Sequence, residues 1–241
     1  MIKFFRNIRQ TLLMENKTSK YLTYAFGEIV LVVVGILIAL QIDAWYDASK
    51  KEKLKQVYTS NLISDLTKDT IQLNARVKLN EYQLRHLDSV LTFIQHPNTT
   101  AEDIKQLGKN DGLAGLRTIN TYNDNTFNIL KSTGNIALFN DTIIQTIMEL
   151  NRLQFAAKGV ADGNRSSYFN LYGSYSKLYV SEIEGNRSLE DDLWVQVDAQ
   201  KHASLFISAT RSRRHSISRF IELTNEVIAK TEELLGMLIP N

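Results

Sequence analysis

The chain contains the stretch YLTYAFGEIVLVVVGILIALQI, residues 21–42, and this stretch decides the fold. Its central part, from Ile29 to Leu40, has no polar side chain. At a rise of about 1.5 Å per residue, roughly 20 such residues cross the ~30 Å hydrocarbon layer of a bilayer as a helix. A helix also satisfies every backbone N–H and C=O inside lipid. We therefore predict one transmembrane helix and place the rest of the chain by reference to it.

Aromatic residues flank this stretch at both ends. Tyr21 and Tyr24 lie at its start, and Trp45 and Tyr46 follow its end. Tyrosine and tryptophan are enriched at both membrane interfaces, where one part of the ring is apolar and the other polar. The sequence thus predicts a transmembrane helix over residues 21–46, with these four side chains as interface anchors.

Residues 1–20 are predicted to form a basic amphipathic helix at the membrane surface. Apolar residues recur there at helical spacing with basic residues around them, namely Phe5, Ile8 and Leu12 with Lys3, Arg6 and Arg9. A cleaved signal peptide is the alternative. However, Glu28 interrupts the apolar run, and no small-residue cleavage site follows Ile42. We expect an anchor that is not cleaved.

The orientation of the anchor follows from charge on its two sides. Basic residues precede the span at positions 3, 6, 9, 17 and 20, and four lysines follow it between residues 50 and 55. Asp43 and Asp47 separate the span from this second cluster, and large domains are translocated with little regard to charge. We expect a bacterial inner-membrane protein with its N-terminus in the cytoplasm and its C-terminal domain in the periplasm.

The opening MIKFFRNIRQTLLMENKTSKYLTYAFGEIVLVVVGILIALQIDAW, residues 1–45, resembles the signature of a Bacteroidota family of single-pass membrane proteins of unknown function. The resemblance continues through NLISDLTKD, residues 61–69, and FNILKSTGNIALFND, residues 127–141. It implies an inner-membrane anchor followed by a helical domain. It implies no activity and no catalytic residue.

Beyond the span, the chain is predicted to be all-α, an extended and mostly antiparallel helical bundle over residues 47–241. Only two prolines and 11 glycines occur in 241 residues, which favours long helices. Apolar residues keep heptad spacing in three seams, which extend from Ile63 to Ile94, from Ile143 to Leu178 and from Ala203 to Leu238. Such stripes are buried when helices pack side by side.

The seams predict long helices over residues 49–95, 142–185 and 199–238. The first of these can continue the span, because no residue between Ile42 and Ser49 breaks a helix. Short helices are expected over residues 101–107, with Thr100 as N-cap, and over residues 126–133, closed by Gly134. Thr70 and Asn80 are polar positions of the first seam. They either fix the register of the helices or face a wet part of the bundle.

The sequence lacks the patterns of common catalytic and metal sites. The absence of cysteine excludes disulfides and thiolate ligands. The four histidines, His86, His96, His202 and His215, are not in metal-binding spacing. No nucleophile elbow or phosphate-binding loop occurs. With 28 basic and 26 acidic residues and no basic stripe, we also expect no nucleic-acid partner. We expect no catalytic residue, metal, cofactor or small-molecule substrate.

Two side-chain clusters outside the span have alternative interpretations. Arg211, Arg213, Arg214 and Arg219 form the densest basic patch, which could bind an anion or an acidic partner, or be a solvated helix face. A stripe of tyrosines at helical spacing could line a pocket or an interface, or form core with hydroxyls at its rim. These are Tyr168, Tyr172, Tyr175 and Tyr179.

One face of the span is predicted to contact another membrane helix. At about 100° per residue, Glu28, Gly35 and Ala39 fall within roughly 40° of one another. Gly35 and Ala39 are a small-xxx-small pair, which allows two backbones to approach closely. An acid in a span costs on the order of 2.5–3.5 kcal/mol at mid-membrane unless it is partnered. Alternatively, the Glu28 side chain can reach the lipid headgroups and pair there with Lys20.

These features predict a non-catalytic scaffold or accessory subunit of a bacterial envelope complex, which acts through helix contacts with a membrane partner, a second copy or both. The alternative is a sensor or ligand-binding bundle on the far side of the membrane. Only about 20 residues precede the span, too few for an output domain. A sensor would therefore signal through a partner protein.

Overall fold

The computed structural model describes residues 18–110, 113, 116, 118, 121–180 and 185–239. The predicted amphipathic segment before residue 18 lies outside these residues. The side chains of the predicted anchors Tyr21 and Tyr24 also lie outside the described part.

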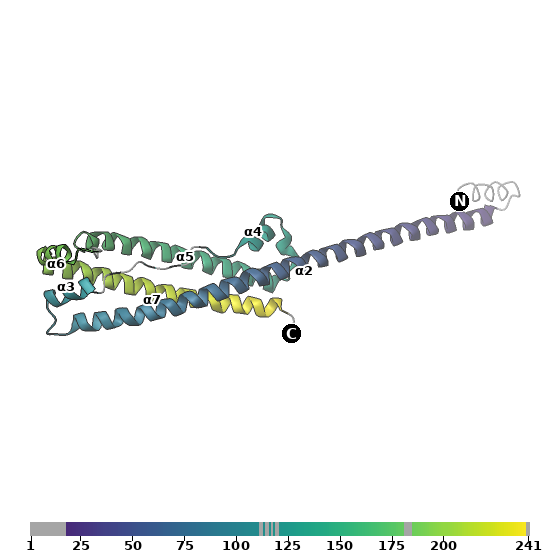
Figure 1. Cartoon of the computed structure of the whole chain (residues 1–241). Coiled ribbons are helices and arrows are strands. Elements are labelled where there is room, and N and C mark those ends of the chain that lie inside the picture. Colours follow the sequence, from purple (N-terminus) through teal and green to yellow (C-terminus); the bar gives the residue numbers. More distant parts are fainter. Residues whose placement is uncertain are drawn as a thin grey trace. The chain divides into compact units, whose positions relative to one another are not determined.

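All regular elements of the described residues are helices, which confirms the all-α prediction (Figure 1). They are α2 (Thr18–Gln95), α3 (Ala101–Asn110), α4 (Asn125–Ser132), the short 3₁₀ helix η1 (Asn135–Leu138), α5 (Asp141–Ser176), α6 (Arg187–Gln196) and α7 (Ala199–Leu238).

The chain divides into two compact units, Met1–Val57 and Tyr58–Asn241. The described part of the first unit is the N-terminal portion of α2. By length and apolar composition this portion could cross a membrane, and none of its most apolar window is buried in the structure. The helix continues without a break through residues 43–49, as the lack of a helix-breaking residue there predicts.

The ends of the helices follow local hydrogen bonding. Pro97 comes two residues after the end of α2. The predicted N-cap of α3 is confirmed, because Thr100 Oγ1 accepts from the N–H of Asp103 at 3.2 Å while the Asp103 carboxylate accepts from the N–H of Thr100 at 2.8 Å. The Asp103 carboxylate also accepts from the Thr100 hydroxyl, and the bonds from the N–H and hydroxyl of Thr100 hold the pKa of this carboxyl below its usual value. Asn140 caps α5 through the N–H of Ile143.

The second unit is a bundle of three long helices, formed by α5, α7 and the part of α2 after Val57 (Figure 1). At one end, Leu62 of α2 shares a cluster with Ile147 of α5 and Leu234 of α7. At the other end, Val90, Tyr175 and Phe206 of the same helices share a second cluster. Thus α7 is antiparallel to both other helices. α2 and α5 therefore run in the same direction.

The interior contains these two apolar clusters, and the buried side chains between them are partly apolar, namely Leu87, Ile217 and Phe220, and partly polar. The proximal cluster includes residues 62–77 of α2 and 227–238 of α7, together with Phe127 and Leu130 of α4. The distal cluster includes Ile104 of α3. The buried side chains of Asn80, Arg213 and Ser216 belong to neither cluster and lie between them along α2 and α7. We call these three residues the polar layer.

The third predicted seam is confirmed in full. Its apolar residues are buried, and so are its four polar ones, Thr210, Arg213, Thr224 and Thr231. Thr231 is accommodated because its hydroxyl donates to the Val227 carbonyl oxygen one turn earlier, at 2.7 Å. Helix α7 begins and ends at the residues that the periodicity predicts, Ala199 and Leu238.

The second long helix differs from the prediction. It ends at Ser176 and not near Gly185, and a separate helix, α6, follows. The predicted seam ends at Leu178, two residues past the true end of the helix, and Tyr179 packs on the distal cluster from outside the helix. Gly185 has a φ of +79°, and Asn186 caps α6 by accepting from the N–H of Leu189.

Candidate functional site

The apolar helix segment packs against none of the other described residues of its unit. The side chains from Ile29 to Leu40 are all exposed, and a Cβ added to Gly35 would meet no atom within 4 Å. Ala39 is exposed on the same face, and Glu28 is half-buried. Trp45, one of the predicted anchors, keeps 75% of its surface exposed. Large apolar side chains in this state need a bilayer or other helices around them.

The predicted anchor Tyr46 is 66% exposed, beside Trp45 on the same helix. Both side chains therefore extend away from the protein, as interface anchors require.

A second site ties the connection between α3 and α4 to α2. Asp69 accepts from the backbone N–H of Asn123 at 3.0 Å and from its side-chain amide at 2.7 Å. One turn earlier, Asp65 accepts from the hydroxyl of Thr126 at 2.6 Å and from its N–H at 3.3 Å. We call Asp65, Asp69, Asn123 and Thr126 the acidic clamp. It joins residues 61–69 to the start of α4.

The clamp is a buried polar arrangement. Asp69 is 3% exposed, and its burial raises the pKa of the carboxyl, against the two bonds from Asn123, which lower it. Burial and the nearby Asp69 carboxylate raise the pKa of Tyr122 to about 12. About two turns before the clamp on α2, the hydroxyl of Tyr58 accepts a hydrogen bond from the side-chain amide of Asn135 at 3.1 Å.

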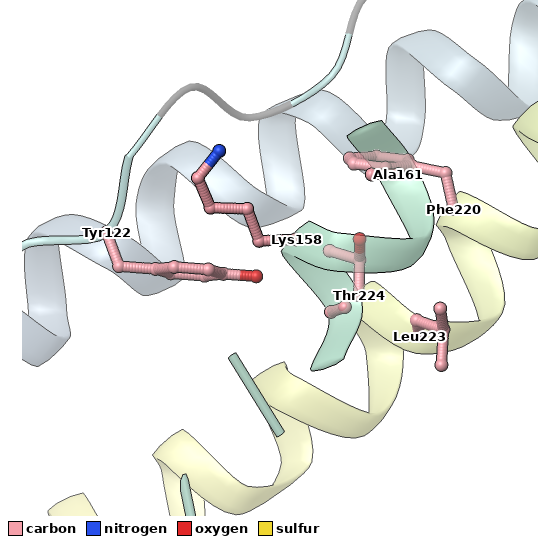
Figure 2. Close-up of a pocket in the computed structure, with 7 residues that line it drawn as sticks. Tyr122, Lys158, Ala161, Phe220, Leu223 and Thr224 are labelled. Atoms are coloured by element: carbon pink, nitrogen blue, oxygen red, sulfur yellow. The ribbon is translucent and has the colours of Figure 1, made fainter. Parts of the chain in front are cut away.

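A small cavity adjoins the clamp. Figure 2 shows Tyr122 extending into it from the connecting segment, with Lys158 of α5 and Thr224 of α7 around the same space. Its volume is about 10 Å³, and a second cavity beside Asp65 and Gln154 has about 30 Å³. Spaces of this size hold one or two water molecules, whereas sites for small molecules usually measure roughly 300–1,000 Å³.

A third site lies in the distal cluster, where aromatic rings surround a histidine. His202 of α7 stacks on Phe206 with ring centroids 6.0 Å apart and lies 5.2 Å from the ring of Tyr175. Trp194 of α6 meets it edge-on at 5.5 Å and also contacts Tyr179 at 5.5 Å. We call these five residues the histidine cluster.

The His202 ring is completely buried, and neither of its nitrogens has a hydrogen-bond partner in the described chain. The ring fits because residue 108 is glycine. A Cβ there would lie 2.5 Å from His202 Cε1 and 3.3 Å from the Tyr175 hydroxyl. Burial lowers the pKa of His202, and the charge of Lys105 lowers it further, while Glu102 acts in the opposite direction.

The tyrosine stripe is largely core. Tyr168 and Tyr175 are buried, and Tyr172 and Tyr179 are half-buried. Burial raises the pKa of Tyr168 to about 12. The stripe therefore packs one side of the distal cluster, and none of the cavities described above lies along it.

The four arginines of the predicted patch point in different directions. Arg213 is buried and donates to Gln83 Oε1 at 3.4 Å. Arg214 pairs with Asp88 of α2 at 2.6 Å, Arg219 pairs with Glu222 on its own helix, and Arg211 is exposed. The structure therefore does not gather them into one exposed surface.

The remaining polar candidates are separate from one another. Among the described residues, no group of three or more histidine, cysteine or acidic side chains is placed to hold a metal. His86, His96 and His215 are exposed, unlike His202. Of the two polar positions in the first seam, Thr70 donates to the carbonyl oxygen of Leu66, and the amide of the buried Asn80 donates to that of Arg76.

Sequence reasoning missed the acidic clamp and the histidine cluster. Asp65 and Asp69 are four residues apart and so share one helix face inside NLISDLTKD. That spacing was a usable signal, although it does not show which residues the carboxylates bind.

The comparison with protein families gives one match. A family model described as DUF6090, a family of unknown function, matches residues 28–154. The chain belongs to this family. No curated protein and no solved structure matches it. The DUF6090 region holds the whole acidic clamp and the proximal parts of α2 and α5. Helices α6 and α7, which complete the histidine cluster, follow it.

Proposed function

We propose that this DUF6090 protein is a non-catalytic scaffold or accessory subunit of an envelope complex in the inner membrane of Bacteroidota. The observation that carries the proposal is the exposed apolar segment of α2. Its side chains from Ile29 to Leu40 are all exposed, with no packing partner among the described residues of their unit. The same helix then contributes Leu62, Leu66 and Leu73 to the proximal cluster. One helix thus contains an exposed apolar segment, which suits lipid or other helices, and a segment that packs in the folded bundle.

The face with Gly35 and Ala39 supports contact with a partner helix or a second copy. Gly35 leaves space for a neighbouring backbone, since none of the described residues fills the position of its missing Cβ. The sensor alternative is supported by the uninterrupted helix from Thr18 to Gln95, along which a shift could pass.

A topology experiment tests the anchor. Because the chain has no cysteine, single cysteines report their own location. We expect Gln200→Cys to react with an impermeant maleimide in intact spheroplasts. Lys3→Cys should react only after the membrane is permeabilised. The reverse pattern would show an inverted orientation, and equal labelling of both in intact cells would contradict a single span.

An association experiment tests the scaffold. The variant Gly35→Leu with Ala39→Leu fills the proposed contact face, and Val33→Phe with Leu37→Phe adds bulk to the opposite face as its control. Both are purified from native membranes after cross-linking, and copurifying proteins are identified by mass spectrometry. We expect the leucine pair to lose a stoichiometric partner or second copy that wild type and control retain. If wild type itself retains neither, the scaffold proposal fails.

A further inference from the structure

Helix α6 is attached to the bundle by few contacts. Trp194 is its one buried residue, and this side chain contacts His202 and Tyr179. A salt bridge of 2.6 Å joins Asp191 to Lys109 of α3, with the aspartate side chain 55% exposed. Exposed ion pairs contribute little, about 0–1 kcal/mol. The attachment of α6 therefore depends mainly on how Trp194 packs against the histidine cluster.

The surroundings of the His202 ring suit the neutral imidazole and not the protonated one. Its ring is sealed by Phe206, Tyr175 and Trp194, and the backbone of Gly108 occupies the side near Cε1. A protonated imidazole has two N–H donors that both require acceptors, and neither nitrogen has one in the described chain. A buried charge without such partners is costly, so the closed distal end favours the neutral ring.

The charged groups around His202 reinforce this preference. From α3, the nearly buried Lys105 opposes a positive ring, while Glu102, which pairs with Lys105 at 3.5 Å, favours it. From α6, Asp191 is engaged by Lys109. The groups that face the ring from α5 and the following segment are the phenols of Tyr175 and Tyr179, which are neutral near pH 7. On α7, Asp198 caps the helix by accepting from the N–H of Lys201.

We infer that α6 is a latch that opens in mild acid: protonation of His202 detaches Trp194 and α6 from the distal end while the proximal cluster stays folded. The two parts have separate apolar clusters, and the polar layer lies between these clusters together with the buried Leu87, Ile217 and Phe220. Opening uncovers the aromatic faces of Tyr175, Tyr179 and Phe206. The protein would then present a new apolar surface at low pH.

The chain supplies its own reporter for this event. Its two tryptophans are Trp45 and Trp194, so Trp45→Phe leaves the one on α6. The full chain carrying Trp45→Phe is reconstituted in lipid nanodiscs and titrated from pH 8 to pH 5. Acrylamide quenching measures the exposure of Trp194, and circular dichroism measures helix content. We expect quenching to rise several-fold with a midpoint below the ordinary histidine value of about 6.5, with most helix retained.

Four variants identify the titrating group. His202→Gln should abolish the transition, and His215→Gln, an exposed histidine of the same helix, should leave it unchanged. Lys105→Gln should move the midpoint to higher pH, and Glu102→Gln should move it to lower pH. These opposite shifts also decide the question if His202→Gln fails to fold, because a purely structural histidine would not produce them.

Three results would overturn the latch. The first is quenching of Trp194 that stays constant from pH 8 to pH 5. The second is a transition whose midpoint shifts in neither Lys105→Gln nor Glu102→Gln. The third is loss of helix content in step with quenching, which would indicate acid unfolding of the whole bundle.

Discussion

Gly108 illustrates how the distal end depends on a single position. It lies inside α3, where glycine usually costs about 1 kcal/mol relative to alanine. The cost is offset because the missing Cβ leaves room for the His202 ring. Three glycines of α5 are different, since a Cβ at Gly159, Gly163 or Gly173 would meet nothing within 4 Å.

This contrast gives a matched pair of substitutions. Gly108→Ala should lower the free energy of unfolding by about 1–3 kcal/mol, because its Cβ overlaps a ring that is packed on all sides and has nowhere to move. Gly159→Ala should raise it by roughly 0.5–1 kcal/mol through helix propensity. Urea titrations followed by circular dichroism measure both. A Gly108→Ala protein as stable as wild type would show that the histidine cluster can rearrange.

Among the elements, α4 has an unusual N-terminus. Asp124 occupies its N-cap position, yet the side chain makes no capping hydrogen bond. The cap comes from another helix, because Asp65 of α2 accepts from both the N–H and the hydroxyl of Thr126. Helix α4 is thereby held to α2 by the same bonds that cap it.

Removing these two carboxylates should have unequal effects. We expect Asp65→Ala to lower the free energy of unfolding by about 1–2 kcal/mol, the usual range for a lost N-cap. Asp124→Ala should change it by less than about 0.5 kcal/mol, as for other surface substitutions. Thermal unfolding at pH 7 compares the two. Equal losses would mean that Asp65 acts through general charge and not through the cap.

The elements also show what the sequence could and could not predict. The seams of α2 and α7 were predictable because apolar residues every three or four positions mark the buried face of a helix. The acidic clamp was not, since Asp69 and Asn123 are 54 residues apart and only the packing of the bundle brings them together. Helix α6 was missed because one buried tryptophan in ten residues leaves no periodicity to detect.

For the whole molecule, buried tyrosines limit the stability of the fold at alkaline pH. Tyr122 lies near the acidic clamp and Tyr168 in the distal cluster, and burial raises the pKa of each to about 12. The pKa of an unfolded tyrosine is about 10. Between these values the unfolded chain has released protons that the folded chain still holds. Stability therefore falls as pH rises from about 10 to 12.

Absorbance at 295 nm tests this expectation. We expect Tyr122 and Tyr168 to ionise only near pH 12, together with unfolding, whereas tyrosine in water has a pKa of about 10. The free energy of unfolding should fall over the same interval, and less so in Tyr168→Phe. Titration of all tyrosines near pH 10 without loss of helix would contradict the buried environment of both rings.

The division of the buried apolar residues into two clusters also bears on how such a chain evolves. Substitutions that share no neighbours have nearly independent effects on stability. Substitutions near Phe206 or Trp194 should therefore have little effect on the packing near Leu66 or Ile147, which lie in the other cluster. We expect substitutions at one end of the bundle to accumulate while selection maintains the other end.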